Sequence, residues 1–189
     1  MENQTSDFLK GNLLVAMPAL TDPNFSHTVS CICEHTAEGA VGLVINRVQP
    51  VLSAKNIFDE LDIESTRTAA AIPIHIGGPV HIDEIFILHG PPFGWAASLT
   101  VTPHIAMTNS IDILKAIALE KGPENYQVTL GCAGWGAGQL EYEIMQNTWL
   151  TYPVDQALAF SMPVESRWEA ALKSMGVDPV LLSGTAGHA

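Results

Sequence analysis

The chain has 189 residues, of which 47% are hydrophobic and 15% are charged; this composition excludes an intrinsically disordered protein and suits one globular domain. Twenty acidic and eight basic residues give a formal net charge of −12. Because the basic residues form no cluster along the chain, and a field of this sign repels phosphate groups, the composition argues against direct binding of nucleic acid.

The first half of the chain alternates short apolar segments with turn residues, which predicts strands joined by loops. Strands are expected at residues 13–16, 28–34, 40–45, 72–76 and 85–89, with turns at 22–24 and 77–79. Ser53 is a candidate N-cap for a short helix that ends at Leu61, because Ile57, Phe58 and Leu61 recur at helical spacing. This helix is expected to pack on the sheet.

The second half of the chain mixes helices and strands. Ile111, Leu114 and Ile117 form the apolar face of a predicted helix that runs from about residue 110 to Glu120. A strand at 126–130, a glycine-rich loop at 131–138, a short helix from about Gly138, a strand at 149–152 and a helix at 163–175 follow. The irregular order predicts a single mixed α+β domain over residues 1–189, and residues 1–7 and 183–189 are expected to be mobile.

Neither a membrane span nor an export signal is predicted. The apolar runs fall short of the roughly 20 residues that a membrane helix needs. Glu2 and Asp7 stand where a secretory signal would carry basic residues. The odd number of cysteines favours reduced thiols over a disulfide framework. The cytoplasm is therefore the expected compartment.

Two groups of residues are candidate metal sites. Cys31, Cys33 and His35 alternate along one predicted strand and would point to one face, where Cys132 could be a fourth ligand. Two thiols on an extended strand lie roughly 6.5 to 7 Å apart, however, and buried free cysteine is common. The second group fits no known ligand spacing and consists of His75, His81, Asp83 and His89. We predict no metal and no cofactor.

The glycine-rich segment surrounds one tryptophan, Trp135. It lacks the Lys-Ser or Lys-Thr of a P-loop and does not fit Gly-x-Gly-x-x-Gly, so nucleotide binding is not favoured. Two interpretations remain open. Glycine either lets Trp135 fold onto the core in a strand-to-helix turn, or the loop forms a pocket for another ligand or a partner.

The sequence contains no recognisable catalytic constellation. Gly-x-Ser-x-Gly is absent, and Glu141 and Glu143 lie roughly 200° apart around a helix, so they cannot pair as catalytic carboxylates. Both are assigned to the helix N-terminus, where negative charge is favourable. Arg47, which follows Asn46 at the end of an apolar strand, could clamp a carboxylate or phosphate, although an exposed salt bridge is the commoner role.

Motifs along nearly the whole chain resemble the YqgE/AlgH family of bacterial proteins. They are residues 14–25, 34–35, 39–47, 77–79, 86–89, 131–150, 167–168 and 186–189. The resemblance implies a compact domain with a mixed, bifurcated β-sheet that includes a small closed barrel and is surrounded by helices. It implies no established activity, although the family's name carries a claim of transcriptional regulation.

We predict a non-enzymatic binding or regulatory protein that acts on transcription only indirectly. Its partner is expected to be an unidentified protein or a small-molecule ligand, bound where the Trp135 loop, the 77–79 turn and the 46–47 pair meet. The candidate residues are Asn46, Arg47, Gly77, Gly78, Pro79, Gly134, Trp135, Gly136, Gly138, Gln139 and Glu141. The alternatives are an enzyme with an unrecognised site at the 131–138 loop and a direct DNA-binding regulator.

Overall fold

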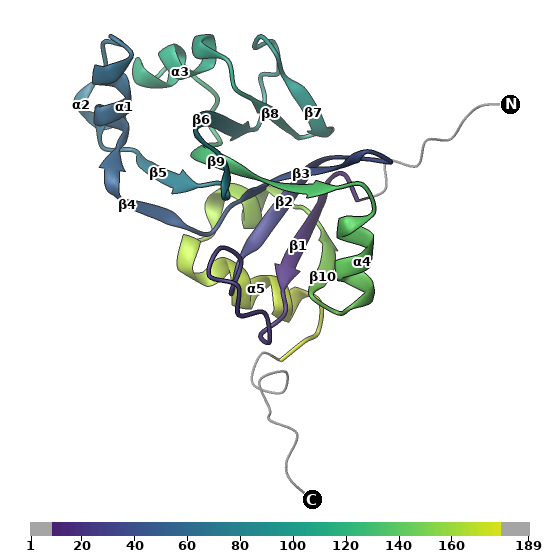
Figure 1. Cartoon of the computed structure of the whole chain (residues 1–189). Coiled ribbons are helices and arrows are strands. Elements are labelled where there is room, and N and C mark those ends of the chain that lie inside the picture. Colours follow the sequence, from purple (N-terminus) through teal and green to yellow (C-terminus); the bar gives the residue numbers. More distant parts are fainter. Residues whose placement is uncertain (1–8, 179–189) are drawn as a thin grey trace, which may run out of the picture.

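The computed structural model describes residues 9–178, and the segments expected to be mobile, 1–7 and 183–189, lie outside that range. Within it, ten strands form one branched sheet with helices packed on it, so the chain has the predicted mixed α+β fold (Figure 1). The strands are β1 (Asn12–Ala16), β2 (Val29–Thr36), β3 (Gly39–Val44), β4 (Val48–Ser53), β5 (Pro73–Ile76), β6 (Val80–His89), β7 (Leu99–Thr102), β8 (Ile105–Thr108), β9 (Tyr126–Gly136) and β10 (Trp149–Pro153).

The helices are short. They are α1 (Ala54–Glu60), α2 (Arg67–Ala70), α3 (Ile111–Ala118), α4 (Gln139–Met145) and α5 (Arg167–Ser174), with a π turn at Ala157–Ser161 and a 3-10 turn at Val164–Ser166. The predicted cap of α1 is confirmed, because Ser53 and Asn56 form a capping box. Figure 1 shows α1, α2 and α3 together at one end of the molecule, whereas α4 and α5 lie beside β1 and β10.

The long strand β9 is the branch point of the sheet. The main path runs β10-β1-β2-β3-β9-β6-β8-β7, and β5 joins β9 in parallel while carrying β4 on its other side. The other strand pairs are antiparallel. β5 pairs with residues 128–130 of β9 and β3 with residues 133–136, so the two neighbours follow one another along β9.

The small closed barrel implied by the resemblance is not found, so that expectation is wrong. Within residues 9–178, β10 and β7 end the path and do not pair with each other. Gly11 approaches β7 closely, since a Cβ on it would lie 3.0 Å from Thr102 Cγ2. Its N–H already donates to the Ile32 carbonyl, and its carbonyl accepts from the Val154 N–H. β7 therefore contacts Gly11 by packing, and within residues 9–178 no ladder joins β7 to β10.

Apolar side chains cover both faces of the central strands, which explains why β1 reads as a continuous apolar run. Leu13 and Val15 point into a core shared with α5, whereas Leu14 and Ala16 point to a second core under α4. A third core lies between β5, β6 and the helices α1 and α3. These layers hold the strands that carry the predicted site residues.

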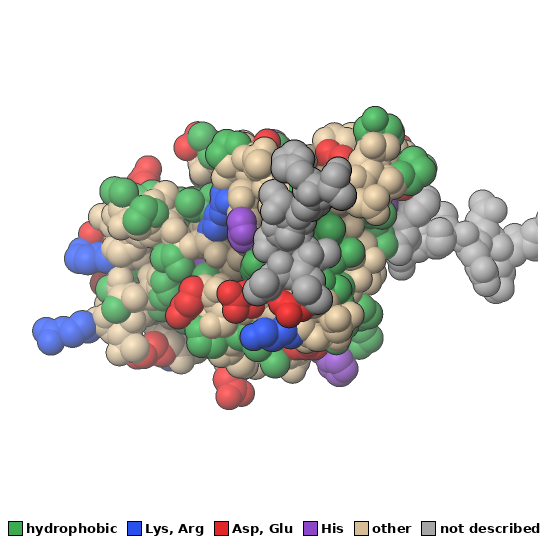
Figure 2. Space-filling view, turned by 90° about the horizontal axis from the view of Figure 1, so that it is seen from below, with side chains coloured by type: hydrophobic (Ala, Val, Ile, Leu, Met, Phe, Trp, Pro, Cys, Tyr) green, Lys and Arg blue, Asp and Glu red, His purple; other side chains and the backbone are tan. Residues whose placement is uncertain are grey.

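The surface agrees with the acidic composition. On the face drawn in Figure 2, acidic side chains lie scattered among apolar and polar ones, and the few basic side chains are separated from one another. Among residues 9–178, no helix has the length and apolar character needed to cross a membrane.

Candidate functional site

The glycine-rich segment is a strand through Gly136, so the predicted loop at 131–138 is wrong for most of its length. Glycine is needed there because another backbone packs against it. A Cβ on Gly77 would lie 2.2 Å from the Gly131 carbonyl oxygen, and one on Gly78 would lie 2.3 Å from the Cys132 carbonyl carbon. Gly131 itself has a φ of 71°, which favours glycine. The 77–79 turn therefore meets the beginning of this segment and not Trp135.

Trp135 belongs to a buried aromatic cluster. Only 5% of its surface is exposed, and its indole N–H donates to Glu143 Oε2 over 3.0 Å. Trp149 donates to the same oxygen over 2.8 Å, and the Phe25 ring lies 6.0 Å and 5.6 Å from the two indole rings. The structure thus agrees with the interpretation in which Trp135 folds onto the core.

The neighbours of Trp135 are also engaged with other parts of the protein. Gln139 accepts from the Gly136 N–H and donates to Glu143, which joins the end of β9 to α4. Gly138 precedes α4 with a φ of 73°. Glu141 lies in the first turn of α4, as expected for a charge at the helix N-terminus, and also contacts His35 of β2. Glu143 lies beyond that turn, where its carboxylate accepts from side chains of β9 and β10.

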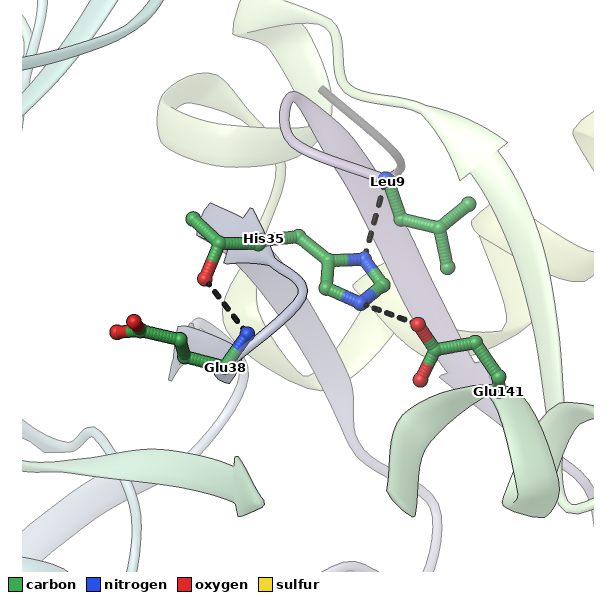
Figure 3. Close-up of polar contacts among 5 residues, drawn as sticks. Leu9, His35, Glu38 and Glu141 are labelled. Carbon is green, nitrogen blue, oxygen red and sulfur yellow. Dashed lines mark hydrogen bonds and ion pairs between the residues drawn. The ribbon is translucent and has the colours of Figure 1, made fainter. Parts of the chain in front are cut away.

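Glu141 contacts the buried His35 (Figure 3). The Leu9 N–H donates to His35 Nδ1 over 3.2 Å, so that nitrogen is an acceptor. Nε2 of the neutral ring then carries the proton and donates to Glu141 Oε1 over 3.1 Å. The pair fixes the beginning of the described chain to α4 and leaves neither ring nitrogen facing a ligand.

The three cysteines are buried and free, but His35 does not join them. β2 pairs Ile32 with Gly42 and then Glu34 with Val41, so Cys33 is an extra residue in a β-bulge. A bulge shifts the phase of the side chains, which places His35 on the opposite face. The hydrogen bond with Cys31, followed by burial, raises the pKa of the Cys33 thiol. In the described part of the chain, no three His, Cys, Asp or Glu side chains are grouped to hold a metal.

The histidines around the 77–79 turn point to different places. His75 and His89 are buried, with Nδ1 facing the carbonyl oxygens of Val128 and Gly90, respectively. His81 is exposed, and its Nδ1 lies 3.0 Å from a Glu84 carboxylate oxygen. These contacts fit the structural role expected for the histidines.

Arg47 and Asn46 brace the loop that precedes β2. The Arg47 guanidinium donates to the carbonyl oxygens of Pro23 and Ser26 over 2.7 Å and 3.0 Å, and within residues 9–178 it forms no salt bridge. Burial lowers its pKa, and the nearby Asp22 opposes that effect. The Asn46 amide accepts from the Val29 N–H over 2.7 Å and donates to the His27 carbonyl.

Only part of the predicted site comes together. Arg47, Gly78 and Pro79 line one small pocket of about 160 Å³. Trp135 lines a separate hollow with Glu34, Thr36 and residues 38–41 of the β2–β3 hairpin. Gly134, Gly136, Gly138, Gln139 and Glu141 line neither pocket. The predicted meeting of all three segments at one surface is therefore not found, and the functional role of the individual residues stays a prediction.

A larger groove adjoins the small pocket and was not predicted from the sequence. It has a volume of about 460 Å³ and shares Ile76, Gly78 and Ile82 with the small pocket. We call it the α1–β6 groove; its lining residues are Gln49, Leu52, Asn56, Ile57, Glu60, Leu61, Ile76, Gly78, Ile82, Asp83, Ile85 and Leu130. The available signal was the apolar residues Val51, Leu52, Val80 and Ile82, which lie where the sequence predicts no regular element.

Two irregular strands form the walls of the α1–β6 groove. β4 pairs Val48 with His75 and then Ser53 with Pro73, so residues 49–52 bulge out of register. β6 pairs Val80 with Cys132 and next Ile85 with Leu130, so residues 81–84 do the same. Each bulge brings apolar side chains to the surface beside the groove.

Comparisons with known proteins agree along the whole chain. A family model described as AlgH-like matches residues 13–180. A UPF0301 protein of Thioalkalivibrio sulfidiphilus is 51% identical over 177 residues, which cover 93% of this chain and 94% of the relative. A UPF0301 protein of Desulforapulum autotrophicum is 46% identical over 177 residues, with 94% of each chain covered.

Two solved structures have a similar fold. The solution structure of the AlgH protein from Pseudomonas aeruginosa matches with a TM-score of 0.78 and 41% identity, covering 100% of both chains. A crystal structure of a Corynebacterium diphtheriae protein matches with a TM-score of 0.71 and covers 98% of this chain and 95% of that one. At 21% identity, this second likeness concerns the fold alone.

Proposed function

We propose that this chain, which belongs to the AlgH-like family, is a binding protein whose partner or ligand occupies the α1–β6 groove. The names of the relatives given above state no reaction. The observation that carries this proposal is the exposure of large apolar side chains around one hollow. Leu52, Leu61 and Ile82 are 39%, 42% and 62% exposed and all line the groove. Any effect on transcription is then indirect.

The size and chemistry of the groove support binding more than catalysis. Its volume of about 460 Å³ falls in the range of roughly 300 to 1,000 Å³ that ligand pockets have. Its lining contains no serine, cysteine, histidine or lysine, so it offers no side-chain nucleophile apart from two carboxylates. Outside the groove, His35 and Glu141 form a possible acid–base pair, but both ring nitrogens of His35 are already hydrogen-bonded within the protein. We therefore favour no enzymatic function.

Binding of Nile red, a neutral fluorescent dye that brightens in apolar sites, tests the proposal. The native protein should bind the dye saturably. Replacing two exposed side chains in Leu52→Ser/Ile82→Ser should weaken binding by about tenfold or more, because it removes two apolar contacts with the dye. Equal binding by the wild type and the double variant would overturn the proposal.

Met145→Ser is the matched control. Met145 is 69% exposed, close to the 62% of Ile82, but it belongs to α4 and does not line the groove. It should leave dye binding unchanged. Urea denaturation of all three proteins checks that the groove variant remains folded, since its substitutions are at exposed positions.

A further inference from the structure

We infer that the occupant of the α1–β6 groove is an extended peptide segment of a partner protein, with aliphatic side chains next to a lysine or arginine. This inference rests on the proposed binding function and names the class of partner. Three features carry it: the backbone of the groove walls, the spacing of the apolar surfaces and the charges at the rim.

The backbone of the walls can accept an added strand. Residues 49–52 of β4 and 81–84 of β6 have no partner in register on the neighbouring strand. On β4, Pro50 has no N–H and the Val51 N–H donates to Gln49 Oε1, so a docked strand would use mainly carbonyl oxygens there. Figure 1 shows β4 at the outer side of β5, where it ends this branch of the sheet. Main-chain groups at such an edge are the usual docking points for an extended peptide. A compact small molecule would use few of them.

The apolar surfaces lie on both sides of the hollow. Leu52 and Leu61 belong to the β4–α1 side, and Ile82 belongs to the opposite bulge, while the largely buried Ile57 and the partly buried Ile85 form deeper parts of the lining. Side chains of an extended peptide alternate between its two faces. Two aliphatic side chains at alternate positions would therefore fill the groove while the intervening one faces solvent.

The negative charges at the rim of the groove favour a positively charged partner. Glu60 and Asp83 are the charged residues of the lining. Within residues 9–178, neither carboxylate has a hydrogen-bond or ion-pair partner. The whole chain has a net charge of −12, which attracts cationic segments to the surface before docking. A basic residue beside the aliphatic pair would complement both carboxylates.

A displayed library of random nine-residue peptides tests the inference. Selection on the wild-type protein should enrich aliphatic-x-aliphatic sequences next to lysine or arginine. The affinity of a synthetic consensus peptide should fall about tenfold or more in Glu60→Lys/Asp83→Lys, because that variant replaces attraction by repulsion. In the labelled wild-type protein, the peptide should shift the backbone amide signals of Gln49, Val51, Leu52 and residues 81–84, since Pro50 has no N–H.

Glu34→Lys/Glu38→Lys is the control, because it changes the net charge equally at exposed positions outside the groove. It should change the affinity less than about twofold, as expected for distant screened charges. Equal losses in both double variants, or a consensus without a basic residue, would overturn the inference. If Nile red binds in the groove and no peptide is enriched, the inference fails while the proposed binding function stands. If the dye does not bind either, both fail.

Discussion

At the scale of single residues, buried indole groups depend on one carboxylate. Trp135 and Trp149 are both buried, and both donate their indole N–H to Glu143 Oε2. A buried N–H that loses its acceptor costs free energy, because water cannot replace the hydrogen bond. Glu143 is thus a structural residue that holds the end of the glycine-rich segment, at Trp135, to α4 and β10.

We predict that Glu143→Ala lowers the free energy of unfolding by about 2 to 4 kcal/mol, since it leaves two buried donors without this acceptor. Urea denaturation followed by tryptophan fluorescence measures the change. Tyr142→Ala removes an adjacent side chain that is 60% exposed and should cost no more than about 0.5 kcal/mol. If Glu143→Ala is as stable as this control, the indole hydrogen bonds do not support the fold.

At the scale of elements, the sequence predicted segments whose side chains are buried in a regular pattern. β1, with its continuous apolar run, and α3, with its apolar face, are both found near their predicted bounds. β4 and α2 were missed, because β4 is largely exposed and α2 has only four residues. The hairpin of β7 and β8, with four residues in each strand, was also missed.

The candidate site was harder to predict than the fold, because residue types along the sequence do not show which distant backbone segments pack against each other. The glycines of β9 were interpreted as a loop, whereas they allow residues 77–78 to pack on the strand. The alternation that aligned His35 with Cys31 failed at the bulge of Cys33, which no residue type in β2 signals. Arg47, Gly78 and Pro79 do line one small pocket, and their role in binding stays a prediction.

The close packing of the 77–79 turn on β9 gives a prediction for glycine substitutions. Gly78→Ala should destabilise the protein by about 4 kcal/mol or more, because its Cβ would overlap the Cys132 backbone and its φ is 151°. Gly136→Ala should change stability by less than about 1 kcal/mol, since its Cβ would meet only Gln139 Oε1 at 3.8 Å. Thermal unfolding of both variants separates these expectations, and similar melting temperatures would contradict them.

At the scale of the whole molecule, a buried polar centre joins the layers. The Arg167 guanidinium donates to the Ile45 carbonyl at the end of β3, to Gln127 of β9 and to the Met162 carbonyl before α5. Burial lowers the pKa of Arg167 to about 10, so the group remains charged at neutral pH. Its positive charge also acts on His75 in β5.

His75 makes the stability of the whole chain depend on pH. Burial lowers the pKa of His75 to about 4, and the Arg167 charge adds to the effect, whereas the hydrogen bond to Val128 opposes it. An unfolded histidine has a pKa of about 6.5, so between pH 6.5 and pH 4 the unfolded chain binds more protons at this site than the folded one. The stability contributed by neutral His75 is therefore complete above pH 6.5 and is lost as the pH falls towards 4.

We predict that wild type loses about 3 kcal/mol more than His75→Gln between pH 7 and pH 4, since a shift of about 2.5 pKa units corresponds to that free energy. His75→Gln should be the less stable protein at pH 7, because glutamine replaces a packed ring, and the difference should narrow or reverse at pH 4. Urea denaturation at pH 7, 5.5 and 4 measures both curves. Removing an exposed histidine in His81→Gln controls for the substitution itself. Parallel curves for wild type and His75→Gln would show that His75 is not the group that weakens the fold in acid.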